Sequence, residues 1–470
     1  MNVTRKSLAA IGLTLCLGGA AVADDVPVTD KPSLVPATRE DLKKALEASK
    51  KNVPRLPLPA PTAEDIAKAQ AAAKARAEAA AKNGQPDVIG KAMGSGVVNN
   101  GRMRALYLSD YGTAVPLMPM GVRQGQGKTP EPTEDFAFQT KMFWIISRGN
   151  NCTYCTGHQE TKLASTGMSD DQIASLDGEW FEFTPAERAA FAFAKKSTFQ
   201  PFAIGDADIA ALKAHYTDAQ ILDIISAVGG FNAMNRWTGA LRIPQEDHRE
   251  YLTPTSSKFA KKASTLAQVG ETTSGMVPPV PRKRPALEAR AEVEKALDAA
   301  RKRTPRLALV DESATKAAIE ASNGNTPPQW MRLLATRPEG ANNRVLSFLN
   351  AETKGKLDPE TKAIIAWTAA RNDHAWYALG HAKARLNALG YSDDKIFSLD
   401  DWDTTADDKT REVVRFARIL TIDPALITDG DFARMKKHFD DQKIAEIVHQ
   451  ATVAASFDRV TEAAGLRLEK

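Results

Sequence analysis

The sequence contains few cysteines, and their scarcity argues against two kinds of metal centre. Three occur among 470 residues, at positions 16, 152 and 155. No second cysteine pair is present to complete, with Cys152 and Cys155, the usual four-ligand set of a structural zinc site. Covalent haem attachment requires a histidine directly after the second cysteine of the motif, and Thr156 occupies that place. We therefore expect neither a metal nor a cofactor at this motif.

A large excess of charge and long apolar runs are also missing. The 62 basic and 58 acidic residues leave a formal net charge of +4, which is too small for this length to indicate a nucleic-acid surface. Beyond the N-terminal segment, no apolar run approaches the roughly twenty residues that a membrane span requires. The composition is that of an ordinary globular protein, and its length allows two or more domains.

Residues 1–23 predict a cleaved secretory signal. A short basic start precedes an apolar run over residues 8–21, and small residues stand before Asp24. Leu15 is too bulky, directly before Cys16, for a typical lipoprotein cleavage site, which favours export over a lipid anchor. Cys16 leaves with the signal. We expect a periplasmic or secreted protein in a compartment that permits disulfides.

The chain is an internal duplication. Residues 168–177 recur as residues 391–400 with seven identities in ten, at an offset of 223 (391 − 168). The same offset holds without a gap for about a hundred residues and pairs Trp144 with Trp367, Arg148 with Arg371, Tyr154 with Tyr377, His158 with His381, and Arg236 with Arg459. An earlier match, at an offset of 251, pairs residues 54–56 with residues 305–307, so each copy includes an N-terminal arm.

The first copy has 28 extra residues between the two registers (251 − 223), which we assign to the Ala-rich tract 63–82 and the Gly-rich segment 90–101. The Ala-rich tract favours a helix but has little apolar face, so we expect an exposed helix. The resulting division is a signal (1–23), a first arm (24–132), a domain with both cysteines (133–253), a linker (254–285), a second arm (286–357) and a domain without cysteines (358–470).

Within each copy the patterns are helical. Residues 136–148 form a dense apolar segment that predicts a buried helix. Thr184 with Pro185, and Thr217, have the pattern of helix starts, and Asp206 is expected to begin another helix. No convincing alternating strand is present. The sequence therefore predicts an all-α protein made of two tandem helical bundles.

The segment around Cys152 and Cys155 predicts a reversible dithiol. Two thiols at i and i+3 of a helix lie on one face and need only a modest adjustment to form a disulfide. Asn150 or Asn151 is expected to cap this helix, whose N-terminus would lower a thiol pKa from about 8.5. His158 follows Cys155 by one turn and can accept or return a proton.

The second copy lacks this chemistry. Ala375 aligns with Cys152 and Ala378 with Cys155, whereas His381 is kept. We therefore interpret copy one as the active half and copy two as a structural partner, in which Tyr377 and His381 serve packing. A zinc site that includes His158 and a purely structural disulfide stay open as alternatives, although copy two indicates that the fold tolerates alanine at both positions.

Residues 143–158 resemble the carboxymuconolactone decarboxylase/alkylhydroperoxidase D family, because an apolar helix, Asn151, a CxxC with Tyr154 and a trailing histidine occur together. The resemblance covers about residues 133–241, and a cysteine-free version covers about 359–468. It implies two alkylhydroperoxidase D-like domains, each with an N-terminal helical arm, and a thiol peroxidase. Cys155 would be the peroxidatic thiol, Cys152 the resolving thiol and His158 the base.

Two positions depart from the family pattern. The family histidine would fall on Gln159, one residue later than His158, and the proton-relay glutamate falls on Thr140. Glu134, Asp135 and Glu160 are the acidic candidates to replace it.

The resemblance also indicates partners: a hydroperoxide substrate, an external thiol reductant and no nucleic acid. Family members associate through these helices, so we expect the copies to pack as a pseudo-dimer and the chain to be able to form homo-oligomers.

Two other functions stay open beside the peroxidase, with lactone decarboxylation as a minor further one. Exported proteins meet few of the reductants that recycle a peroxidase, so a thiol–disulfide oxidoreductase acting on exported proteins is the first alternative. A non-catalytic assembly protein with a structural disulfide is the second. An apolar cleft beside Cys155 would favour organic hydroperoxides, whereas an exposed CxxC in a peptide groove would favour protein thiols.

Overall fold

A computed structural model describes residues 30–82, 87, 90, 96–112, 132–178, 180–252, 275–310, 315–323, 325–338 and 340–469. The predicted signal lies outside these residues. The described chain is predominantly helical, and its one sheet is a two-residue antiparallel pairing of β1 (Val35–Pro36) with β2 (Met276–Val277). The all-α prediction is confirmed. In the part of the chain that the structure describes, no helix is both long enough and apolar enough to span a membrane.

The helices α5, α8, α9 and α10 of copy one begin where the sequence predicts. Thr184 and Thr217 each accept the backbone N–H of the third helical residue, whose side chain returns a bond, so both predicted starts are capping boxes. The elements are η2 (Pro132–Glu134), α5 (Phe136–Gly149), α6 (Thr153–Ser165), α7 (Asp170–Ser175), η3 (Trp180–Glu182), α8 (Pro185–Phe199), η4 (Pro201–Ala203), α9 (Asp206–Lys213) and α10 (Asp218–Ala240).

Copy two repeats these elements 223 residues later. The first residues of α5, α6, α8, α9 and α10 plus 223 are the first residues of α15, α16, α19, α20 and α21. The elements are α15 (Pro359–Asp373), α16 (Trp376–Ala388), α17 (Asp393–Phe397), η5 (Ser398–Asp401), α18 (Trp402–Thr405), α19 (Asp408–Ile422), η6 (Pro424–Leu426), α20 (Asp429–Met435) and α21 (Asp441–Ala463).

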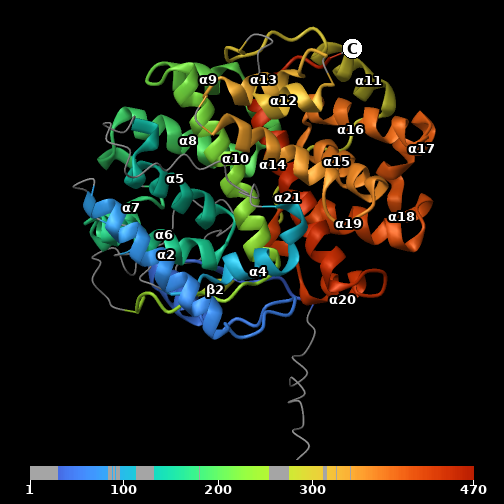
Figure 1. Cartoon of the computed structure of the whole chain (residues 1–470). Coiled ribbons are helices and arrows are strands. Elements are labelled where there is room, and N and C mark those ends of the chain that lie inside the picture. The colour runs from blue at the N-terminus through green and yellow to red at the C-terminus, as the bar shows by residue number, and fades with distance from the viewer. Residues whose placement is uncertain are drawn as a thin grey trace, which may run out of the picture.

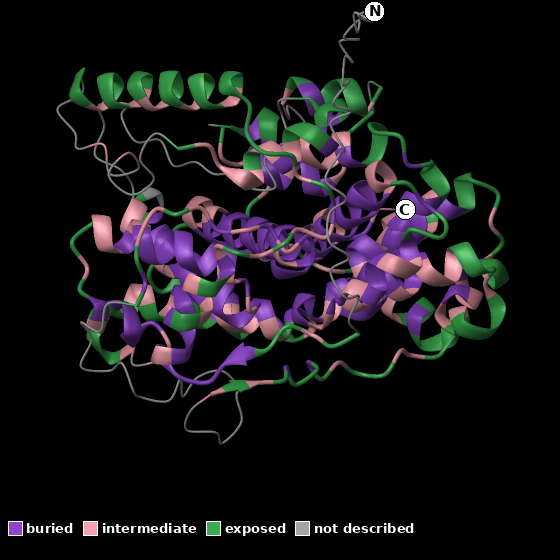
Figure 2. Cartoon of the chain, turned by 90° about the horizontal axis from the view of Figure 1, so that it is seen from below, coloured by how far each residue is buried: buried purple, intermediate pink, exposed green. Residues whose placement is uncertain are grey.

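Each copy also has an arm, and the arms differ in length. The first contains α1 (Arg39–Ser49), α2 (Ala63–Lys82), α4 (Asn99–Tyr107) and η1 (Ser109–Tyr111); the second contains α11 (Arg290–Ala300), α12 (Lys316–Ala321), α13 (Gln329–Ala335) and α14 (Ala341–Thr353). The Ala-rich helix α2 has no buried residue, which confirms the prediction of an exposed helix. Figure 2 shows the buried residues gathered in the middle of the molecule, beneath such exposed elements.

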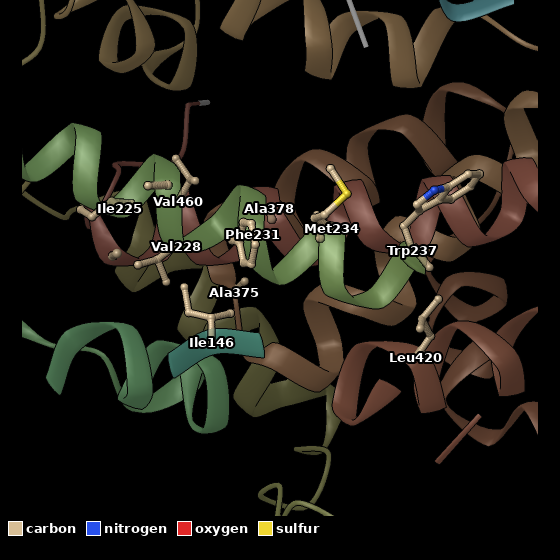
Figure 3. Packing of buried hydrophobic residues seen from close by; sticks show 14 of the residues in the cluster. Ile146, Ile225, Val228, Phe231, Met234, Trp237, Ala375, Ala378, Leu420 and Val460 are labelled. Carbon is tan, nitrogen blue, oxygen red and sulfur yellow. The ribbon is translucent and has the colours of Figure 1, made fainter. Parts of the chain in front are cut away.

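The two copies lie side by side, with α10 and α21 packed together between them (Figure 1). The helices approach closely, because a Cβ atom at Gly229 would lie 2.9 Å from the side chain of Val460. Apolar side chains of both helices line this contact (Figure 3). The core is therefore continuous from one copy to the other.

Reciprocal arginines hold this interface. Arg236 Nε donates to the carbonyl of Leu420 at 3.1 Å, and its counterpart Arg459 donates to the carbonyl of Ser197, also at 3.1 Å. Since Leu420 lies 223 residues after Ser197, each copy offers the same surface to the other, as in an isologous dimer.

The arms bind across the interface in the same reciprocal manner. Arg55 of the first arm pairs with Asp429 of copy two at 2.7 Å, and Arg306 of the second arm pairs with Asp206 of copy one at 2.5 Å. The offset of 251 relates the two arginines and the offset of 223 relates the two aspartates. Each arm therefore joins both copies.

Candidate functional site

The site begins at the turn between α5 and α6. Asn150 ends α5, Asn151 has a left-handed backbone with φ 52°, and Cys152 is itself the N-cap of α6. The prediction that Asn150 or Asn151 caps this helix is wrong. Asn150 instead donates to Asn232 Oδ1 at 3.0 Å, and Asn151 supplies the reversal of chain direction.

An arginine from the second part of the predicted linker fixes this turn. Arg282 is buried and donates to the carbonyl of Gly149 at 2.9 Å and to Asn150 Oδ1 at 2.8 Å. These bonds satisfy acceptors at the end of α5. The helix that carries the cysteines is therefore positioned by residues from three separate segments.

Both cysteines are free thiols in the interior. The residues Cys152 and Cys155 are 2% and 3% exposed, and the Thr238 hydroxyl of α10 lies 3.1 and 3.0 Å from their sulfur atoms. The Cys155 N–H points at Cys152 Sγ, 3.3 Å away. The first sulfur thus occupies the position where a helix N-terminus stabilises negative charge.

The thiol pair favours one negative charge, on Cys152. Burial acts to raise the pKa of Cys152, but hydrogen bonds from the Cys155 thiol, the Thr238 hydroxyl and the Cys155 amide outweigh burial and leave that pKa below its ordinary value. Burial, followed by the hydrogen bond to Cys152 and its charge, raises the pKa of Cys155 well above the ordinary range. Cys155 is therefore the thiol of the pair that keeps its proton to higher pH.

His158 lies one turn further along α6 and has an acidic partner that the sequence did not indicate. Its Nε2 is 2.9 Å from Glu246 Oε2, and its Nδ1 is 2.8 Å from the carbonyl of Tyr154. Nε2 therefore faces a carboxylate, whereas Nδ1 lies near both a carbonyl oxygen and the Gln245 amide Nε2, 3.2 Å away. Among the described residues, no hydrogen bond joins His158 to either thiol.

Glu246 is held by further donors at the same place. Its Oε1 accepts from the Tyr154 hydroxyl at 3.0 Å and from the backbone N–H of Asn99, the first residue of α4. Burial acts to raise the pKa of Glu246, but the hydrogen bond and charge of His158 outweigh it, so that pKa lies below its ordinary value. Tyr154, His158 and Glu246 form a connected group that we call the triad.

The acidic candidates suggested by the sequence do not join this group. Glu160 pairs with Arg39 Nη2 at 2.8 Å, and the carboxylate of Asp135 caps α5. The hydroxyl of Thr140 donates to the carbonyl of Phe136 within α5. The side chain of Glu134 lies outside the described residues.

Copy two contains the same triad. His381 Nε2 lies 3.0 Å from Glu469 Oε2, and the Tyr377 hydroxyl donates to Glu469 Oε1 at 2.9 Å. Glu469 follows Glu246 by 223 residues, so the duplication offset was the signal that could have identified the acid. Because copy two lacks thiols, the triad does not depend on them.

A second donor set overlaps the triad in copy one. The Nε2 atoms of His158 and His248 and a carboxylate oxygen of Glu246 all lie within 4.8 Å of one another. Two imidazoles and a carboxylate are the donors of many zinc and non-haem iron centres. The residues therefore fit a three-ligand metal site, distinct from one built on the thiols, and the expectation of no metal stays a prediction.

An apolar cleft of about 700 Å³ lies between α2, α4 and α6. It reaches α6 at Lys162, whose pKa burial lowers, but its lining does not include either cysteine. Inside copy one, the rings of Phe143 and Phe231 stack with centroids 4.0 Å apart.

No known family model matches this chain, and no curated protein sequence matches it. The resemblance noted above therefore stands on residues 143–158 and on the duplicated helical pattern alone.

Proposed function

We propose that this protein is an exported thiol peroxidase of the alkylhydroperoxidase D-like type, which reduces hydroperoxides with Cys152 and Cys155. The observation that carries the proposal is the pair of free, buried thiols that favours one negative charge at a helix N-terminus. A neighbouring His158–Glu246 pair supports it by offering a proton. Peroxide reduction needs a thiol that can lose its proton as it attacks and a second thiol close enough to resolve the sulfenic acid, and a Cys152 thiolate beside Cys155 can take that proton.

The proposed reaction has two steps. Cys155 passes its proton to the Cys152 thiolate and attacks the terminal peroxide oxygen, so that a bond forms between sulfur and oxygen while the O–O bond breaks. The departing alkoxide takes a proton from the His158 imidazolium and leaves as the alcohol. Cys152 then attacks the Cys155 sulfenic acid, and the disulfide forms as the hydroxyl leaves with the Cys152 proton as water. The dithiol loses two electrons and the peroxide gains them.

Cys155 takes the attacking role because of its place as well as the resemblance. Its counterpart Ala378 lines a cavity in copy two, whereas Ala375, the counterpart of Cys152, does not line it. Cys155 is thus on the helix side that opens to a cavity in copy two, and in copy one the Phe143 and Phe231 rings occupy that space. An external thiol reductant then restores the dithiol by exchange.

Burial favours the peroxidase over the two alternatives. A protein disulfide cannot reach thiols that are 2% and 3% exposed without local opening, whereas a small hydroperoxide needs less space. The assembly protein with a structural disulfide is favoured less, because copy two has alanine at both positions and keeps its helix, α16.

Stopped-flow oxidation of the reduced mature protein by cumene hydroperoxide and by hydrogen peroxide tests the proposal. We expect fast oxidation that is lost in Cys155→Ser, and a trapped sulfenic acid in Cys152→Ser. A trapped sulfenic acid in Cys155→Ser would reverse the two thiol roles. Oxidation no faster than that of a free thiol in solution would overturn the peroxidase, and the reduction potential of the pair would then separate an exchanging oxidoreductase from a structural bond.

A further inference from the structure

The cysteine-free copy contains a cavity of about 340 Å³ beside its triad. The lining comes from α12 to α16 and α21 and from the loop before α13, and includes His381 of the triad. This volume lies near the lower end of small-molecule sites, which are commonly about 300–1,000 Å³. The cavity is thus large enough for a molecule about the size of one substituted ring.

The cavity exists because copy two lacks side chains that fill copy one. Ala366 and Ala454 both line it, and they are the counterparts of Phe143 and Phe231 (143 + 223 and 231 + 223). In copy one those two rings stack on each other. The duplication therefore replaced a packed aromatic pair by open space at the position that faces the lost thiol.

Three aromatic rings wall the space. Trp330, Phe348 and Phe457 meet edge to face, with centroids 5.2 to 5.8 Å apart. Such an arrangement offers ring faces and edges to an apolar guest.

One polar group in this wall has no partner. Asp458 is 2% exposed and lines the cavity, and among the described residues its Oδ2 has no hydrogen-bond partner. Its counterpart in copy one is Asn235, whose amide donates to Ser147 Oγ at 3.2 Å. Burial, followed by the charge of the nearby Asp373, raises the pKa of Asp458 well above its ordinary value. Its Oδ2 is thus available for one hydrogen bond with a ligand.

The other charged groups of the lining are already engaged. Arg385 pairs with Glu352 at 2.7 Å, and Lys362 donates to two backbone carbonyls. The Nε2 atom of His381 is paired with the Glu469 carboxylate. Among these described residues, no charged side chain is left unpaired to bind a charged ligand. The lining therefore favours a neutral ligand.

We propose that copy two binds a small neutral organic molecule in this cavity, with an apolar, ring-sized body between the aromatic walls and one oxygen function bonded to Asp458. The site does not depend on the thiols or on peroxide reduction. Copy two would then be the binding half of the chain and copy one the reactive half.

The test uses phenol and benzene as probes of the reduced full-length mature protein, without peroxide. Calorimetry and Trp330 fluorescence are expected to show phenol bound at least tenfold more tightly than benzene. The double variant Ala366→Phe/Ala454→Phe restores the aromatic pair of copy one and should weaken phenol binding at least tenfold. Asp458→Asn, which installs the residue of copy one, should reduce the preference for phenol over benzene.

Crystals soaked with 4-bromophenol give a second measurement that needs no variant. Bromine located between Trp330 and Phe457 would support the proposal. Bromine found only elsewhere, or phenol binding unchanged in a folded double variant, would overturn it. Because no peroxide is present, neither result bears on the peroxidase.

Discussion

The two copies share a skeleton and differ in what fills its centre. Copy one has a dithiol and a stacked pair of phenylalanines, whereas copy two has alanines at all four positions, three of which line a cavity. The triad is present in both. It therefore has a role that needs no thiol: it ties the first turns of α6 and α16 to the segments that follow α10 and α21. In copy one the same group lies where a proton donor is useful.

The largest expected effect concerns the arginines that join the copies. Arg459 pairs with Asp373 at 2.8 Å in the interior, whereas its counterpart Arg236 donates only to oxygen atoms without a full charge, among them the carbonyls of Leu420 and Thr421. Arg459→Met leaves the buried Asp373 carboxylate with Arg284, at 3.0 Å, in place of two arginine partners, and should cost about 3 kcal/mol, the low end for a broken buried pair. Arg236→Met leaves unpaired carbonyls and should cost about 1–3 kcal/mol. Denaturant unfolding of both variants measures how much each substitution lowers the free energy of unfolding. Equal losses in the two variants would contradict the unequal roles of Arg459 and Arg236.

The next prediction separates the two roles of the triad. His158→Gln should slow peroxide oxidation about a hundredfold, because general acid catalysis of that size is lost. His381→Gln is its matched control in copy two and should leave the rate unchanged. Both should lower stability by similar amounts. If His381→Gln slowed oxidation as much as His158→Gln, the triad would act only through the fold.

The sequence predicts those features of the fold that depend on residues close together in the chain. The starts of α8 and α10 were predictable because Thr184 and Thr217 bond to residues three positions away. The duplication offset predicted which elements correspond. Glu246 was missed because it lies in irregular chain after α10, and only the packing of that chain against α4 brings it to His158. The start of α6 was misassigned because Asn151 is used for a left-handed turn and the sulfur of Cys152 replaces an oxygen cap.

A smaller effect is expected for the pH dependence of oxidation. The pKa of Cys152 lies below its ordinary value, so its thiolate forms at lower pH than that of a free thiol. The rate should therefore rise with pH and level off at a lower pH than the reaction of a free cysteine does. Thr238→Val removes a hydrogen bond to the thiolate, raises that pKa and should move the rising limb to higher pH, with a severalfold slower reaction near neutrality. Thr461→Val is the matched change in copy two and should leave the profile in place. An unshifted limb in Thr238→Val would show that the hydroxyl does not stabilise the thiolate.

The smallest effect is expected where copy one has an element that copy two lacks. The helix α2 has no buried residue, and two of its ion pairs, Lys68–Glu64 and Lys74–Glu78, are exposed pairs within the helix itself. A third, Arg76–Asp87 at 3.0 Å, is partly buried and joins α2 to the chain that follows it. Since exposed pairs contribute little, replacing residues 62–82 by a short Gly/Ser linker should change the free energy of unfolding by less than about 1 kcal/mol. The same variant opens one wall of the 700 Å³ cleft, so oxidation by cumene hydroperoxide should change relative to hydrogen peroxide if that cleft guides organic substrates. If the ratio of the cumene hydroperoxide rate to the hydrogen peroxide rate and the free energy of unfolding both stayed unchanged, α2 would contribute neither to the core nor to the path of the substrate.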